Sequence, residues 1–114
     1  MISQKLAIKP ISINEAYKGR RYSTPKLKKY KEQIGLMLKA GRLNQSARIG
    51  LKIYFGYSSS GSDIDNGVKP FLDCLQDKYS FNDNRIYELK VYKSVVPKGA
   101  EYITFELYEL VDQN

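Results

Sequence analysis

Hydrophobic and polar residues alternate along three stretches of the chain, 47–57, 86–96 and 101–110. Alternation with a period of two is typical of half-buried β-strands. The residues expected to face the core are Ile49, Leu51, Ile53 and Phe55 in the first stretch, Tyr87, Leu89, Val91 and Val95 in the second, and Ile103, Phe105 and Leu107 in the third. A shorter strand is expected at 4–9, before Pro10. The turn at 97–99 predicts that the last two strands form a hairpin.

Two other stretches repeat apolar residues at intervals of three and four, as amphipathic helices do. The first helix should begin at Thr24-Pro25, a capping hydroxyl followed by proline at the first helical position, and should end at Gly41. The second should occupy about 66–78, with Pro70 near its true start because proline is excluded from helix interiors. We therefore predict an α+β fold in which two helices pack on a small mixed sheet of about four strands. A chain of 114 residues should form a single domain, 1–114.

The composition excludes several classes of enzyme, because the chain has no histidine and one cysteine. Ser-His-Asp and Cys-His catalysis, the usual zinc sites and imidazole bases are all ruled out. An enzyme of this composition has to use carboxylates, lysine, hydroxyl groups and a hard metal ion. The single Cys74 excludes an internal disulfide and fits a reducing cytoplasm. The sequence also shows no signal peptide and no apolar run of about 20 residues, so we expect no membrane partner.

The net charge of +7 is concentrated in the first part of the chain. Eleven of the 19 Lys and Arg residues precede position 44, together with only two of the 12 acidic residues. Such a basic segment favours an anionic polymer as partner, and the interleaved Tyr17 and Tyr22 could stack on exposed bases. A solvated basic surface without a partner is the alternative. The expected DNA-binding residues are Lys18, Arg20, Arg21, Lys26, Lys28 and Lys29.

An acidic stretch follows the Ser/Gly-rich segment at 58–62. Asp63 and Asp65 are two residues apart, so in extended backbone their side chains point the same way. If a helix starts near Asp65, then Lys69 and Asp73 lie four and eight residues further along one face of it. Two acids, a lysine and a third acid gathered in this way are typical of magnesium-dependent phosphate chemistry.

Two other interpretations fit the spacing alone. The aspartates could serve only as helix caps and turn residues, which would leave a module that binds branched DNA without catalysis. Alternatively, Asp73 or Asp77 could pair with Glu88 and Lys90 in a nuclease of another design. Glu88 and Lys90 fall on the polar face of an alternating strand, however, and that placement needs no catalytic explanation.

Two runs of sequence resemble the RusA family of Holliday junction resolvases. The run at 63–75 reads Asp-Ile-Asp-Asn-Gly-Val-Lys-Pro-Phe-Leu-Asp-Cys-Leu, and the run at 81–86 reads Phe-Asn-Asp-Asn-Arg-Ile. The centre of that family reads Asp-x-Asp-Asn, with Lys four residues after the second Asp, another Asp four residues later, and a further Asp after a short turn. The segment Pro10-x-Ser12-x-Asn14-x-x-Tyr17 is similar to its N-terminal signature.

The resemblance implies a small homodimeric, Mg²⁺-dependent endonuclease of a bacterium or prophage that cuts four-way DNA junctions; whether Mn²⁺ substitutes is left open. Carried over by position, it implies catalytic roles for Asp63, Asp65, Lys69 and Asp83, metal binding by the three aspartates, and supporting roles for Asn66 and Asp73. One site cuts one strand, and a chain of this length cannot house two, so paired cuts also imply a two-fold dimer. Two positions depart from the family pattern. Residues Ser58–Ser62 stand where relatives in the family often have basic residues. Asn82 precedes Asp83 where some relatives have a second Asp.

Overall fold

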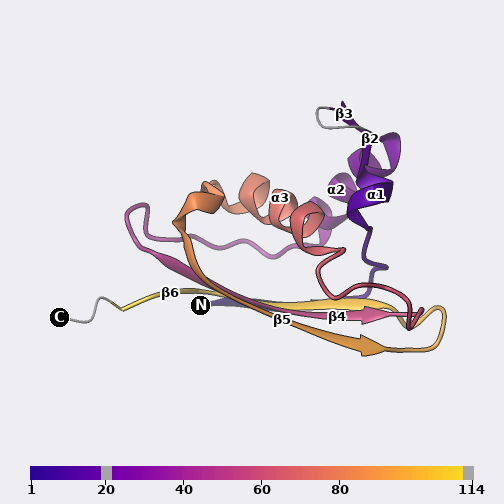
Figure 1. Ribbon diagram of the computed structural model, residues 1–114. Helices are drawn as coiled ribbons and strands as arrows, with labels where there is room; N and C mark the ends of the chain where they lie inside the picture. Colours follow the sequence, from indigo (N-terminus) through magenta and orange to yellow (C-terminus); the bar gives the residue numbers. More distant parts are fainter. Residues whose placement is uncertain (19–21, 112–114) are drawn as a thin grey trace.

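A four-stranded mixed sheet, covered on one face by two helices, forms the body of the protein (Figure 1). The computed structural model describes residues 1–18 and 22–111. In chain order the elements are β1 (Ile2–Leu6), α1 (Ile13–Ala16), β2 (Tyr17–Lys18), β3 (Tyr22–Ser23), α2 (Pro25–Met37), β4 (Ile49–Tyr57), α3 (Val68–Tyr79), the 3₁₀ turn η1 (Asp83–Arg85), β5 (Ile86–Val95) and β6 (Tyr102–Glu109). The predicted α+β class is confirmed. The structure adds the short α1 and the two-stranded ribbon of β2 and β3.

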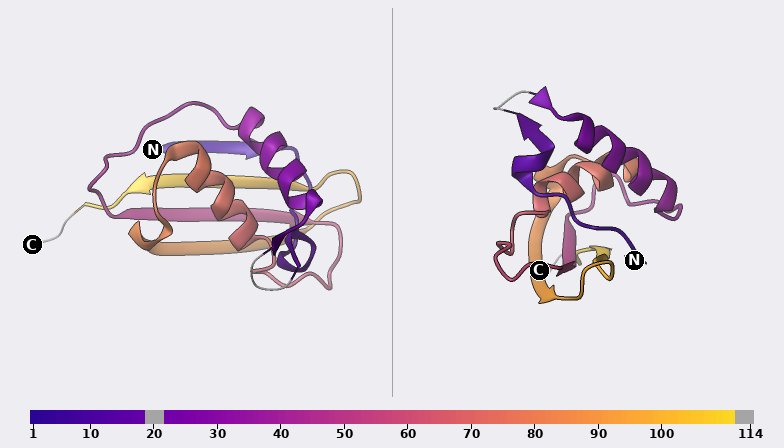
Figure 2. Two further views of the ribbon diagram at one scale, coloured as in Figure 1. Left: turned by 90° about the horizontal axis from the view of Figure 1, so that it is seen from above. Right: turned by 90° about the vertical axis from the view of Figure 1, so that its right-hand side faces the viewer.

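The strand order is β1-β6-β4-β5, with β4 and β5 parallel and the other pairs antiparallel. Parallel neighbours need a crossover connection, and α3 supplies it between β4 and β5. The predicted hairpin of the last two strands is therefore wrong, because β4 lies between β5 and β6 (Figure 2). Both runs alternate, but alternation gives no information about which strand lies next to which. As an edge strand, β5 leaves Leu89 and Val95 about half exposed, whereas Phe105 of β6 is fully buried.

The core lies between the sheet and the helices α2 and α3. Phe71 of α3 packs edge-on against Phe55 of β4 and Phe105 of β6, and all three rings are fully buried. The residues predicted to point inward from β4 and β6 are all buried. Two boundaries differ from prediction. The strand expected at 4–9 runs from Ile2 to Leu6, and α2 ends at Met37, before Gly41.

Gly41 is explained by packing. A Cβ atom at this position would lie 2.8 Å from the Ile2 side chain, so glycine allows the segment after α2 to pass close to β1.

Tyrosine rings lie flat on the opposite, uncovered face of the sheet. Tyr54 and Tyr92 stack with their ring centroids 4.8 Å apart. The rings of Tyr108 and Tyr102 lie over Gly50 and Gly56, where an added Cβ would come within 2.2 and 2.3 Å of ring atoms. The two strand glycines thus make room for cross-strand aromatic side chains. In the part of the chain that the structure describes, no helix is long and apolar enough to cross a membrane.

Candidate active site

The loop of residues 58–67, here called the acidic loop, connects the end of β4 to the start of α3. The side chains of Asp63 and Asp65 are exposed in it. The loop is held by backbone hydrogen bonds: the amide of Asn66 donates to the carbonyl of Asp63 (3.2 Å), and the amide of Val68 donates to the carbonyl of Asp65 (3.1 Å). Gly67 is the N-cap of α3, and no side chain caps that helix. The carboxylates of both aspartates are therefore not used as caps of α3.

Gly67 brings the acidic loop close to the sheet. A Cβ atom at this position would lie 2.9 Å from the Phe55 ring and 3.1 Å from the hydroxyl oxygen of Tyr57. The same hydroxyl oxygen accepts a hydrogen bond from the Gly67 amide (3.2 Å). Burial raises the pKa of Tyr57, and the charge of Asp65 adds to the rise. The end of β4 and the acidic loop are thus joined at Gly67, two residues after Asp65.

Lys69 and Asp73 lie together one turn apart on α3, as the spacing predicted. The Lys69 ammonium is 4.0 Å from the Asp73 carboxylate and 5.7 Å from the centroid of the Tyr17 ring. The Tyr17 hydroxyl donates a short hydrogen bond to the other oxygen of Asp73. Burial and this carboxylate raise the pKa of Tyr17 well above its ordinary value, so the phenol stays a donor. The Asp73 side chain is only 20% exposed, while that of Lys69 is 58% exposed and can reach a substrate.

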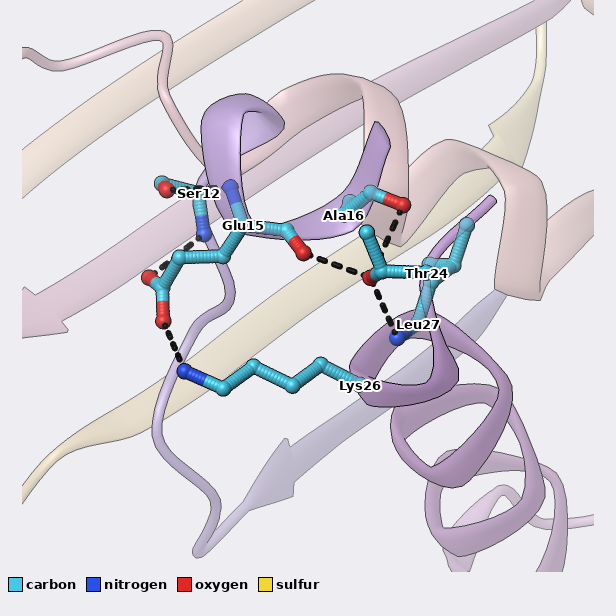
Figure 3. Close-up of polar contacts among 6 residues, drawn as sticks. All are labelled: Ser12, Glu15, Ala16, Thr24, Lys26 and Leu27. Atoms are coloured by element: carbon cyan, nitrogen blue, oxygen red, sulfur yellow. Dashed lines mark hydrogen bonds and ion pairs between the residues drawn. The ribbon is translucent and has the colours of Figure 1, made fainter. Parts of the chain in front are cut away.

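The segment before Tyr17 is held in place by hydrogen bonds of its side chains and backbone (Figure 3). Ser12 and Glu15 form a capping box around the short helix α1. Thr24 donates its hydroxyl to the carbonyl of Glu15 (2.6 Å) and accepts from the Leu27 amide, which ties α1 to the start of α2. Burial tends to raise the pKa of Glu15, but the hydrogen bonds from Ser12 and the ion pair with Lys26 outweigh it and lower the pKa. These contacts fix the direction in which the chain enters Tyr17.

The same segment also holds the acidic loop, because the amide of Ile13 donates to the carbonyl of Asn66 (2.9 Å). Tyr17 and Ile13 therefore connect the N-terminal signature to both parts of the candidate site. The sequence suggested Tyr17 as a base-stacking residue and as part of the N-terminal signature, without a contact to Asp73. The two residues are 56 positions apart, and no local pattern predicts such a pair.

Asp83 lies away from the other two aspartates. It begins η1, beyond the C-terminal end of α3, whereas the acidic loop precedes the N-terminal end of that helix (Figure 1). Over the described ranges 1–18 and 22–111, no group of three or more Asp, Glu or Cys side chains is placed to hold a metal ion. One chain therefore pairs Lys69 with Asp73 on α3 and places Asp63 and Asp65 in the loop that precedes this helix, but leaves Asp83 beyond its other end.

The structure describes only some of the predicted DNA-binding residues. Lys26, Lys28 and Lys29 are exposed on the first turns of α2, and Lys26 pairs with Glu15 at 3.4 Å. Arg20 and Arg21 lie outside the described residues, as does the side chain of Lys18.

Glu88 and Lys90 lie on the uncovered face of the sheet, since they are in register with Gly50 and Lys52 of β4. Asp73 and Asp77 belong to α3, on the other face. Glu88 instead accepts a hydrogen bond from the Tyr108 hydroxyl and lies 4.0 Å from Lys90. The arrangement of an α3 acid with Glu88 and Lys90 is therefore not formed.

Residues 11–104 match the family model of endodeoxyribonuclease RusA. The chain belongs to the RusA family. The match spans every residue of the candidate site, from Ser12 and Tyr17 to Asp83, and it identifies the protein as a member of a family of endodeoxyribonucleases that resolve Holliday junctions. No curated protein matches the sequence. Family membership also argues against the other alternative drawn from the sequence, a module that binds branched DNA without catalysis.

Proposed function

We propose that this protein is a metal-dependent endodeoxyribonuclease that resolves four-way DNA junctions by paired hydrolytic cuts, working as a homodimer in the cytoplasm. The observation that carries the proposal is the Lys69–Asp73–Tyr17 cluster, with Asp63 and Asp65 exposed in the loop that leads into the same helix, in a chain whose residues 11–104 match the RusA family. A basic helix, α2, lies on the same side of the sheet as this cluster and offers a surface for the phosphate backbone (Figure 2).

The residues present fit a magnesium ion. Mg²⁺ keeps several waters and is usually bound by one or two carboxylates together with substrate phosphates, and two exposed carboxylates from one loop match that demand. Asp63 and Asp65 would hold the ion. The family resemblance implies Asp83 as a third ligand, although α3 separates it from the acidic loop within one chain; Mn²⁺ prefers similar oxygen ligands. When bound, the metal would supply a Lewis acid at the scissile phosphate and an activated water.

The other residues of the site would hold the Lys69 ammonium in position for the phosphate. Asp73 holds Lys69 on one side and accepts from Tyr17 on the other, so its two oxygens are both engaged. Lys69 would stabilise the negative charge that builds on the phosphoryl oxygens during cleavage. Asn66 would act through the backbone, because its carbonyl fixes the acidic loop to Ile13. The expected products carry a 5′-phosphate and a 3′-hydroxyl.

The test is incubation of a synthetic four-way junction with the protein and Mg²⁺, scoring paired nicks near the crossover that DNA ligase can seal. Asp65→Asn should abolish cleavage and leave junction binding in gel shifts intact. Asp77→Asn is the matched control, because Asp77 lies on α3, is 68% exposed and pairs only with Lys31 in the described structure. Unchanged cleavage by Asp65→Asn with Mg²⁺, or a wild type that retards the junction without nicking it, would contradict the proposal.

A further inference from the structure

A polar hollow of about 170 Å³ lies between the N-terminal segment and the acidic loop. Its walls come from the chain before and within α1, from the end of β4, from the acidic loop and from Glu101, which precedes β6. Ser62 and Asn66 are among the lining residues, and they stand directly beside Asp63 and Asp65 in the sequence. Sites for drug-sized ligands measure about 300–1,000 Å³, so this hollow suits a smaller ring system. It adjoins the candidate active site.

Uncharged hydrogen-bonding groups line much of the hollow. They are the side chains of four serines, at positions 12, 58, 59 and 62, and the side-chain amide of Asn66. Within residues 1–18 and 22–111, the side-chain amide of Asn66 makes no hydrogen bond. An amide offers both donors and an acceptor, and a serine hydroxyl can act as either. The hollow can therefore match a ligand that carries donors and acceptors on one edge.

The charged groups of the hollow argue against an anion inside it. Glu15 and Glu101 contribute two carboxylates, and Lys9 contributes one ammonium. Glu15 pairs with Lys26 at 3.4 Å (Figure 3). Hydrogen bonds from its own amide and from the Ser58 hydroxyl lower the pKa of Glu101, so that this acid is ionised at neutral pH. The two carboxylates would repel a phosphate and would accept hydrogen bonds from the N–H groups of a neutral ligand.

A nucleobase has the properties that this hollow requires. It is neutral, flat and small, and its edge carries N–H donors beside ring-nitrogen and carbonyl acceptors. Enzymes that take a base out of a duplex recognise it by hydrogen bonds to that edge. Extruding a base costs a few kcal/mol, and the cost is least where pairing is already weakened. The crossover of a four-way junction, where strands exchange partners, is such a place.

Lys9 connects the hollow to the basic helix α2. It also lines a second hollow, of about 270 Å³, together with Lys26 and Lys29 from the first turns of α2. Three ammonium groups therefore lead from α2 to the rim of the first hollow. The phosphates of one DNA strand can follow these groups while a base of that strand turns inward.

We infer that the first hollow, here called the base pocket, holds one unpaired base of a DNA strand at the crossover, with Lys9 at its rim on a neighbouring phosphate. Asn66 and Glu101 provide hydrogen-bonding groups for the edge of the base. The extruded base anchors the strand beside the acidic loop, so that an adjoining phosphate is presented to Asp63 and Asp65. This inference rests on the proposed function for its substrate.

Disulfide trapping tests whether a base enters the pocket. Ser59 is exposed and lines the pocket, so Ser59→Cys places a thiol there. The probe is a four-way junction in EDTA with one cytosine that carries, on its amino group, a tether ending in a mixed disulfide. The introduced thiol should displace the small thiol of the tether and form a cross-link at one position near the crossover. Cys74 should not compete, since it is 4% exposed and burial raises its pKa to about 12.

The control for trapping is Ser46→Cys. Ser46 is also exposed, but it precedes β4, whereas the pocket lies at the other end of this nine-residue strand. This variant should form no cross-link wherever the tether is placed. Absence of a cross-link with Ser59→Cys at every crossover position, or equal trapping by both variants, would overturn the base pocket.

Fluorescence tests whether the base is enclosed. A 2-aminopurine at the trapped position should brighten severalfold when the wild type binds in EDTA, and acrylamide should quench it less than it quenches the free nucleoside. Ser59→Leu fills the pocket and should abolish the protection from acrylamide. Ser60→Leu, at the next residue, which does not line the pocket, should keep it. Protection that is the same in both variants would show that the base lies elsewhere.

The contact of Lys9 with phosphate has its own measurement. Lys9→Ala should weaken junction binding at low salt and reduce the slope of log affinity against log salt by about 0.9. An unchanged slope would remove Lys9 from the inference.

Failure of the base pocket is distinguishable from failure of the proposed function. A wild type that cuts the junction with Mg²⁺, but gives neither trapping nor protection in EDTA, overturns the pocket alone. A wild type that binds the junction and traps the base, but never nicks DNA with Mg²⁺, overturns the proposed function and supports the pocket.

Discussion

Tyr17 is the residue that the structure adds to the catalytic group. Its hydroxyl engages one oxygen of Asp73, and the other oxygen faces Lys69. A hydrogen bond to a carboxylate contributes about 1.5–3 kcal/mol, and Tyr17→Phe removes it without removing the ring against which Lys69 lies. We expect single-turnover cleavage to slow about tenfold with unchanged junction affinity.

The matched control for Tyr17 is Tyr79→Phe. It deletes a hydrogen bond of 2.7 Å to the carbonyl of Lys39, at the opposite end of α3 from Lys69. This variant should lose about 1 kcal/mol of stability and keep its cleavage rate. Equal cleavage rates for Tyr17→Phe and wild type would show that Tyr17 supports the fold alone.

Substitution of two glycines by alanine should change the stability of the protein in opposite directions. Gly67→Ala would place a methyl group 2.9 Å from the Phe55 ring, so the acidic loop has to shift. We expect a loss of about 1–3 kcal/mol in the free energy of unfolding and slower cleavage. Gly35→Ala, within α2 and with nothing within 4 Å, should gain up to about 1 kcal/mol through helix propensity. Urea unfolding of both variants measures the difference, and destabilisation by both would contradict the packing argument.

Sequence spacing predicted the local part of the site and missed the rest for a physical reason. Lys69 and Asp73 meet because residues four apart on a helix are neighbours. Tyr17 meets Asp73 only because α1 is tied to both α2 and the acidic loop, through contacts that depend on the whole fold. The position of Asp83 is likewise a consequence of topology, since the parallel crossover carries it to the far end of α3.

Among the elements, α2 gives the clearest expectation for DNA binding. Lys28 and Lys29 are exposed on its first turns, where their charges oppose the helix dipole. If they contact phosphates, Lys28→Ala and Lys29→Ala should each weaken junction binding at low salt and reduce the slope of log affinity against log salt by about 0.9. Lys98→Ala, in the turn between β5 and β6, is the control and should leave the slope unchanged.

Elements were predicted where local signals are strong. Thr24 caps α2 with its side chain and Pro25 begins the helix, as the sequence indicated. The prediction that the last two strands form a hairpin is wrong because long-range packing decides which strands lie side by side. Placing β6 beside β4 buries Phe105 against Phe71 and leaves the more polar β5 at the edge.

At the scale of the whole molecule, the absence of histidine shapes the response to pH. No histidine titrates between the carboxylates and the thiol and phenol groups. Burial raises the pKa of Cys74 from 9.0 to about 12 and that of Tyr30 well above 10.0. A group with a raised pKa in the folded state contributes stability that is fully present below its unfolded pKa and is lost as pH rises toward the folded value.

The protein should therefore lose stability in alkali, beginning at the pH where the Cys74 thiol ionises in the unfolded chain. The free energy of unfolding should be nearly constant from about pH 6 to 8.5 and should fall from about pH 9, where the unfolded thiol ionises but the buried Cys74 does not. Cys74 contributes a slope of about 1.4 kcal/mol per pH unit. Cys74→Ala removes that slope between pH 9 and 10, although the small cavity lowers its stability at every pH. Urea unfolding across pH 7–11 measures both curves, and parallel curves between pH 9 and 10 would mean that Cys74 ionises equally in the folded and unfolded chains.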